Sequence, residues 1–369
     1  MVLVECWLID ICVDICVTGT YRTPRLTQGE AYYKRILGTN TYSIFSAGRE
    51  QHSHYVWNAT MAEKGVNNVI SAEYDHHTKC GTGAKHLFVW FDACAGQCAN
   101  WVLVMFHCLI TDPSLQNEKG ENPYMMYERL DSLTPLKGHT YLENDRGIST
   151  VVRESNNGKW KTISDYRDWM QITRDANQNR PHRVVEFEQS MHYDWATFLS
   201  QIYVRGRKDI SGVKAKLLGA RWRSYGASEE KVYPADGGPP RVELVEHPGE
   251  VWIRYSLDDD EPWTKIDMRR WASKLYQGCY NRDVSGTMMN IGTDELPFKE
   301  WIADHTEFQL YSGPRPISPA KKKDLVYLCR ILPEEKREYY MNLLDDNSII
   351  DSGKDEDDLA DEEIEDGVE

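Results

Sequence analysis

The sequence lacks a long hydrophobic run, since none reaches the roughly 18 apolar residues that a membrane-spanning helix needs. It also lacks a dense cysteine framework, because its nine cysteines are odd in number and scattered. Both absences point to an intracellular protein that does not associate with a membrane. No P-loop, dinucleotide-binding glycine set, Gly-x-Ser-x-Gly elbow or internal repeat is present, so the common signatures of nucleotide-binding and serine-hydrolase sites are missing.

The first 17 residues are apolar but are interrupted by Glu5, Asp10 and Asp14. They lack the basic segment that begins a signal peptide, so they predict a core strand. A strand this close to residue 1 is also what a fragment of a longer protein would show.

The net charge of −15 is unevenly distributed. Residues 344–369 contain 13 acids and one lysine, whereas the first 343 residues contain 42 basic and 45 acidic residues. We therefore predict a disordered acidic tail over residues 344–369 and a folded part that is nearly neutral. The overall charge does not exclude a nucleic-acid partner for that folded part.

The central stretch runs from His86 to Asn100. Its first six residues, HLFVWF, predict a buried strand that ends at Asp92, and the apolar pattern of residues 101–110 predicts a helix. A lone acid at the carboxyl end of a central strand is where α/β sheets place ligand and metal groups. The alternative is that Asp92 only caps the following helix.

Other segments predict alternating strands and helices. Strands are predicted near residues 31–37, 41–45, 54–57, 251–255 and 264–271, and helices near 58–77, 124–133, 164–177 and 318–343, the last split at Pro333 and carrying three lysines near its start. The order strand, hairpin strands, helix, strand, helix is that of a ribonuclease-H-like domain. We predict an α/β fold with a ribonuclease-H-like mixed sheet flanked by helices over residues 1–227. An α+β extension over residues 228–343 would pack on this core.

Residues 205–223 form a basic segment with seven lysines and arginines and a single aspartate. A nucleic-acid groove is one interpretation and a solvated face is the other. A further hypothesis is that the acidic tail folds back over this segment as a polyanion mimic. The candidate nucleic-acid-binding residues are Arg205, Arg207, Lys208, Lys214, Lys216, Arg221 and Arg223.

Cysteine and histidine pairs suggest a zinc site only weakly. The members are Cys12, Cys16, Cys94, Cys98, His76, His77 and Cys80. Their spacing fits no common zinc pattern, so buried structural thiols are the favoured interpretation.

Several motifs resemble an uncharacterised, transposon-derived domain family of insects and other animals, which itself resembles the ribonuclease-H-like DDE transposase core. The matching blocks cover roughly residues 10–343: Thr23-Pro24-Arg25-Leu26, Ala31-Tyr32-Tyr33-Lys34-Arg35, Tyr55-Val56-Trp57, Asp92-Ala93-Cys94-Ala95-Gly96-Gln97, Gly138-His139-Thr140-Tyr141-Leu142, Asp145-Arg146, Trp252-Ile253-Arg254, and Asp324-Leu325 through Tyr339-Tyr340. The Asp92 block followed by the Gly138 block is the most specific pair.

The resemblance implies two-metal cleavage and joining of nucleic-acid strands. In that chemistry three carboxylates hold two Mg²⁺ ions, which activate the nucleophile and stabilise the leaving oxygen. Asp92 and Asp145 match two of the family's acids, and His139 is placed to orient a ligand or the attacking water.

The sequence departs from the family at the remaining metal positions. Cys16 stands where the family has its first Asp, and Asp14, on the same face of a strand, is the nearest acid. Gly147 and Val152 replace a later Asp and Glu, with Glu154 as a displaced substitute. The metal set would be Asp14, Asp92 and Asp145.

We therefore predict a transposon-derived domain that has lost catalysis and is retained for binding DNA or protein. The alternative is an active Mg²⁺-dependent transposase. Either function places the chain in the nucleus rather than the cytoplasm.

Overall fold

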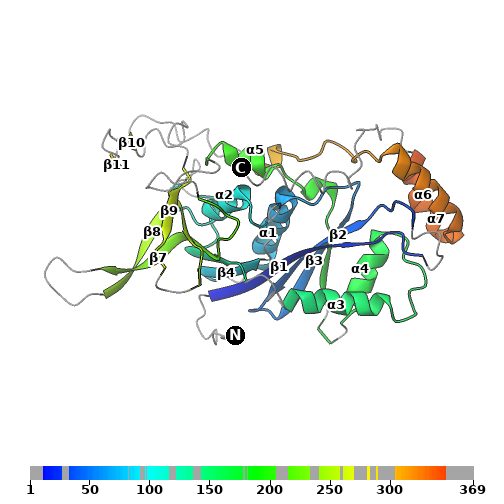
Figure 1. The fold of residues 1–369 in the computed structure, drawn as a ribbon, viewed down its shortest axis with the longest axis horizontal. Coiled ribbons are helices and arrows are strands. Elements are labelled where there is room, and N and C mark those ends of the chain that lie inside the picture. The colour runs from blue at the N-terminus through cyan, green and yellow to red at the C-terminus, as the bar shows by residue number, and fades with distance from the viewer. Residues whose placement is uncertain are drawn as a thin grey trace. The chain divides into compact units, whose positions relative to one another are not determined.

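The protein has a mixed α/β fold, as the sequence predicts, with helices flanking mixed sheets (Figure 1). Within the described residues no helix is both long and apolar enough to cross a membrane. The predicted tail lies outside the described residues from position 346 onward. The computed structural model describes residues 11–26, 33–81, 83–91, 96, 98–115, 122–135, 143–177, 179–180, 182–204, 215–232, 241–257, 261–269, 281–282, 288–289 and 304–345.

The chain divides into two compact units, each assembled from separate stretches of sequence. Unit 1 comprises Met1–Asp14, His77–Thr140 and Asp194–Phe308, and unit 2 comprises Ile15–His76, Tyr141–Tyr193 and Gln309–Glu369. The boundary expected at residues 227/228 falls inside strand β7 (Trp222–Val232).

Unit 1 is built on a sheet with the strand order β1-β4-β5-β7-β8-β9. Strand β1 contributes only its first residues to this unit. β4 and β5 are parallel, whereas β5-β7, β7-β8 and β8-β9 are antiparallel. The elements are β1 (Ile11–Tyr21), β4 (His86–Phe91), α2 (Trp101–Leu109), β5 (Arg129–Leu133), α5 (Trp195–Ser200), β7, β8 (Arg241–Arg254), β9 (Thr264–Asp267), β10 (Asn281–Arg282), β11 (Met288–Met289) and the short helix η5 (His305–Glu307).

The predicted central strand and the helix after it are confirmed as β4 and α2. Along β4, Leu87, Val89 and Phe91 are fully buried and the residues between them are half-buried, so one face packs on the core. Helix α2 is capped by Asn100, whose side chain accepts a hydrogen bond from the backbone N–H of Val102. Asp92 is therefore not the cap of this helix.

The helix predicted over residues 124–133 is wrong, because its second half is the strand β5. The strand contains Asp131, which is completely buried. Its carboxylate pairs with His86 Nε2 at 2.6 Å and Arg129 Nε at 2.8 Å, and accepts from Trp222 Nε1 at 2.7 Å. These contacts, one from β5 itself and two from the neighbouring strands β4 and β7, compensate the burial of the charge.

Unit 2 has the strand order β6-β3-β2-β1, with an antiparallel β2-β3 hairpin and a parallel β3-β6 pair. Helices α3 and α4 pack on β2, β3 and each other. Helix α1 begins in this unit and ends in unit 1. The elements are β2 (Thr39–Ser46), β3 (Gln51–Asn58), α1 (Val66–Cys80), α3 (Glu143–Ser155), α4 (Tyr166–Asp175), β6 (Arg183–Glu186), the short helix η2 (Gln189–Met191), α6 (Pro319–Ile331) and α7 (Glu334–Asp345).

Helices α6 and α7 confirm the predicted pair and its break at Pro333. Ser318 caps α6 by accepting from the backbone N–H of Lys321, and Pro319 occupies the first turn, where its missing N–H costs nothing. The two helices share a buried cluster that includes Leu328 and Tyr340. The strand predicted at residues 31–37 is not formed at residues 33–37, and β2 begins at Thr39 instead.

Candidate nucleic-acid interface

The structure describes only part of the predicted catalytic set. Asp92 and His139 lie outside the described residues. Asp14 is on β1, but its side chain is not among those described. Asp145 and Glu154 are both on helix α3, in unit 2, and both are half-buried.

Asp145 and Glu154 cannot serve the same metal centre. They are separated by nine positions on one helix, which amounts to about 13 Å along the axis and a rotation of about 180°. One of them at most can face a site shared with other acids. Glu154 is therefore an alternative to Asp145 and not an addition to it.

Gly147 faces the ring of His52 on β3. A Cβ atom at Gly147 would lie 2.6 Å from His52 Cε1. The His52 ring is held by a 3.2 Å contact between its Nδ1 and Asn144 Oδ1, and it packs against Phe45 and His182 with centroids 4.7 and 5.0 Å apart. Burial lowers the pKa of His52. A carboxylate at position 147 would therefore collide with a packed imidazole.

We expect Gly147→Ala to lower the free energy of unfolding by about 1–2 kcal/mol, because overpacking outweighs the gain in helix propensity of about 1 kcal/mol. In a His52→Ala background the same substitution should stabilise the protein by up to about 1 kcal/mol, since only propensity remains. Urea unfolding of the four proteins measures both effects. An equal effect of Gly147→Ala in the two backgrounds would contradict this packing account.

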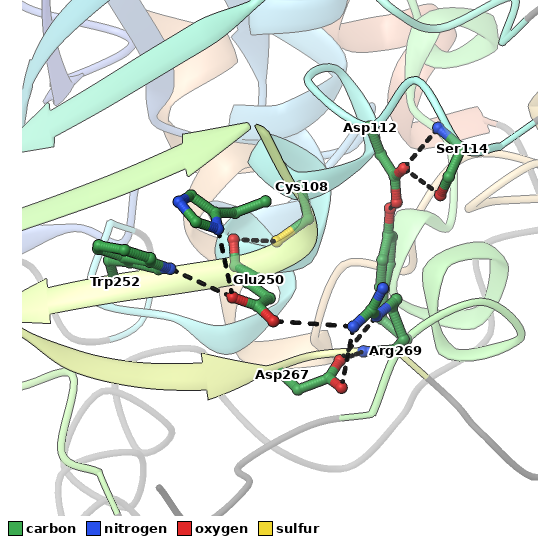
Figure 2. A network of polar contacts seen from close by, with 9 residues as sticks. Cys108, Asp112, Ser114, Glu250, Trp252, Asp267 and Arg269 are labelled. Atoms are coloured by element: carbon green, nitrogen blue, oxygen red, sulfur yellow. Dashed lines mark hydrogen bonds and ion pairs between the residues drawn. The ribbon is translucent and has the colours of Figure 1, made fainter. Parts of the chain in front are cut away.

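Two carboxylates in unit 1, those of Asp267 and Glu250, converge on an arginine, and a third lies in the same polar network (Figure 2). Asp267 accepts from Arg269 Nε at 3.0 Å and from its Nη2 at 3.2 Å, and Glu250 Oε1 lies 3.7 Å from Nη2. The Arg269 side chain is only 4% exposed, so these ion pairs are largely shielded from water. The guanidinium supplies the positive charge that a metal ion would bring.

The third carboxylate, Asp112, belongs to the same network. Ser114 donates to Asp112 through its backbone N–H and its hydroxyl, and Tyr203 donates its hydroxyl at 3.3 Å. Burial raises the pKa of Asp112. Gly249 has a φ of +69°, and a Cβ there would meet Arg269 Cγ at 2.4 Å, so glycine is required at this position.

The described residues contain no group of three or more histidines, cysteines and acids that could hold a metal ion. Cys16, Cys80 and Cys98 are buried, which agrees with the structural interpretation of the cysteines in this part of the chain. Cys12 and Cys94 fall outside the described side chains.

The predicted basic segment is only partly described. Arg205, Arg207, Lys208 and Lys214 lie outside the described residues. Lys216 is exposed, and Arg221 donates to the carbonyl of Pro135 at 2.6 Å. The prediction for Arg223 is wrong. This residue is 2% exposed and donates to the carbonyl of Cys98 at 2.9 Å, so it cannot contact nucleic acid.

A different cationic surface, which we call the basic patch, forms in unit 2. It brings together two segments that lie far apart in the sequence, the one before β2 and the first turns of α6. Asp324 joins them, because Lys34 Nζ and Arg35 Nη1 each lie 3.3 Å from its carboxylate. The cations of the basic patch are Lys34, Arg35, Lys321, Lys322 and Lys323.

Among the described residues that define the patch, Asp324 is the one acid, and its carboxylate already contacts Lys34 and Arg35. It also accepts from the backbone N–H of Arg35 at 3.1 Å. Burial alone raises the pKa of Asp324, but the hydrogen bonds from Arg35 and Lys34 outweigh it and hold the pKa below its ordinary value. Asp324 is therefore ionised at neutral pH, and it pairs with two of the five patch cations, Lys34 and Arg35.

The position of the three lysines strengthens the positive field of the patch. They lie in the first turns of α6, where the helix dipole is itself positive, so they repel the helix end. Two tyrosines accompany them: Tyr33 is 85% exposed, and the Tyr327 ring has Lys34 Nζ 4.6 Å from its centroid. A phosphate backbone would relieve the repulsion, and the rings offer stacking surfaces for bases.

Unit 1 has a second group of cations, but these are packed on tryptophans. Arg254 lies 4.2 Å from the ring centroid of Trp263, and Lys265 lies 3.7 Å from that of Trp252. These side chains are half-buried. Their cation–π contacts account for their position on the sheet, so we do not assign them to the interface.

Comparisons of the chain with protein-family models, with curated proteins and with solved structures find no match. Sequence reasoning noted the three lysines of α6 but assigned them no role. The only signal that could have paired them with Lys34 and Arg35 is that Lys34 and Arg35 fall in one block of the family resemblance and the three lysines directly precede another block, which begins at Asp324.

Proposed function

We propose that this chain is a transposon-derived, catalytically degenerate ribonuclease-H-like domain that binds nucleic acid through the basic patch. The observation that carries the proposal is that Asp324 pairs with Lys34 and Arg35 directly after Lys321, Lys322 and Lys323 on α6, so that cations of two distant segments lie on one surface. Neighbouring lysines repel one another, so the patch carries some electrostatic cost. A polyanionic partner would turn that cost into binding free energy.

The arrangement of elements supports the ribonuclease-H-like part of the proposal. A first strand, an antiparallel hairpin, a helix, a strand and a helix follow one another as β1, β2-β3, α1, β4 and α2. β1 neighbours β2 in unit 2 and β4 in unit 1. Because one fold hosts many functions, this order supports ancestry and not activity.

Two features favour loss of catalysis over the active enzyme. Cys16, at the position of the family's first Asp, is 1% exposed, and a buried thiol is a poor ligand for Mg²⁺. Gly147, at the position of a later Asp, is covered by His52. A nuclear location follows from binding DNA.

The proposal predicts binding without cleavage. Labelled single- and double-stranded oligonucleotides should bind the full chain, and gels should show them intact after incubation with Mg²⁺ or Mn²⁺. Calorimetric titration of either metal should give the same result for the parent and for Asp92→Ala. Metal-dependent cleavage that Asp92→Ala abolishes would establish the active transposase instead.

A further inference from the structure

The acidic end of the chain begins beside the basic patch. Helices α6 and α7 are joined by only two residues, so they run in opposite directions and pack side by side, as Figure 1 shows. Leu325 in the first half of α6 and Leu344 in the last turn of α7 belong to the same buried cluster, so the end of α7 packs on the first half of α6. The chain therefore leaves α7 on the same pair of packed helices that carries Lys321–Lys323.

The sequence that follows is complementary in charge to the patch. Residues 346–369 contain 12 acids and one lysine, and nine of the acids fall within residues 355–366. These 24 residues reach at most roughly 80 Å when extended, which is ample for a patch that starts at the neighbouring helix end. A tether this short gives the acidic stretch an effective concentration of about millimolar at the patch.

We propose that residues 355–366 bind the basic patch of the same chain and mimic a polyanion there. The contact is autoinhibitory toward any other polyanion, because both would neutralise the same lysines. It is electrostatic, so salt weakens it. The inference rests on the patch and on the position of the tail, and it holds whether or not nucleic acid is the competing ligand.

A zero-length cross-linking experiment tests the contact directly in the full chain. A carbodiimide joins a carboxylate to a lysine amine only where the two already touch, and peptide mass spectrometry locates the links. At low salt we expect links from residues 355–366 to Lys321, Lys322 and Lys323 at several times the yield of links to the exposed lysines Lys64, Lys79 and Lys161. At about 0.5 M NaCl this excess should vanish.

Two further arms make the test decisive. Replacing Asp355, Glu356, Asp357 and Asp358 by their amides should reduce the patch links at least several-fold, without touching the folded part. A mixture of light and heavy isotope-labelled chains should give links within one chain. Equal yields at all exposed lysines, or links mainly between chains of different mass, would overturn the proposal. Either result would leave nucleic-acid binding to be judged on its own assay.

Discussion

Arg269→Met should lower the free energy of unfolding by about 3–5 kcal/mol, because it leaves Asp267 and Glu250 without their shared cation. The side chain is 4% exposed, so water cannot replace the lost charge without opening the structure. The expected loss is a large part of the stability of a typical domain. Denaturant unfolding of the full chain, followed by circular dichroism, measures it.

The matched control removes the opposing charge as well. Asp267→Asn combined with Arg269→Met should cost less than the sum of the two single substitutions, since the double variant buries one fewer uncompensated carboxylate. Additive losses, or a loss below about 1 kcal/mol for Arg269→Met, would show that the network in Figure 2 contributes little to stability.

The combined substitution of Lys321, Lys322 and Lys323 by glutamine should reduce oligonucleotide affinity by roughly 10- to 100-fold at about 0.1 M salt, because each lysine that contacts a phosphate releases a counterion. The lysines are on the surface of α6, and glutamine is also a good helix former, so the fold should be unchanged. Fluorescence anisotropy with a labelled oligonucleotide measures the change.

A charge-matched control distinguishes the effect of the patch on affinity from the effect of the net charge of the chain. Lys64, Lys79 and Lys161 are exposed lysines outside the patch, and replacing all three by glutamine should change affinity by less than about threefold. Equal losses in the two triple variants would mean that binding follows overall charge and not the patch.

The helices and strands that were predicted correctly are those whose conformation follows from the pattern of their own residues. The apolar run of β4, the apolar pattern of α2 and the Ser-Pro start of α6 are all local signals, and all three elements are confirmed. β5 could not be found this way. Its buried Asp131 looks like a surface residue until His86, Arg129 and Trp222 pair with it.

The candidate site was predictable only in part, for a related reason. The basic segment at residues 205–223 is visible as a run, yet Arg223 is turned inward to the carbonyl of Cys98. The basic patch depends on contacts such as that of Lys34 with Asp324, which are 290 positions apart, and no local pattern encodes that pairing. A side chain at position 147 would likewise meet the His52 ring only because β3 places His52 against α3, which no local pattern reveals.

The dependence of oligonucleotide affinity on salt tests the central claim most directly. We expect the logarithm of the affinity of the parent chain to fall linearly with the logarithm of the NaCl concentration. In the Lys321, Lys322 and Lys323 triple variant, the slope should be shallower by about 2–3, which corresponds to three lost phosphate contacts. Identical slopes in the two proteins, or no binding by the parent even at low salt, would contradict a nucleic-acid interface at the basic patch.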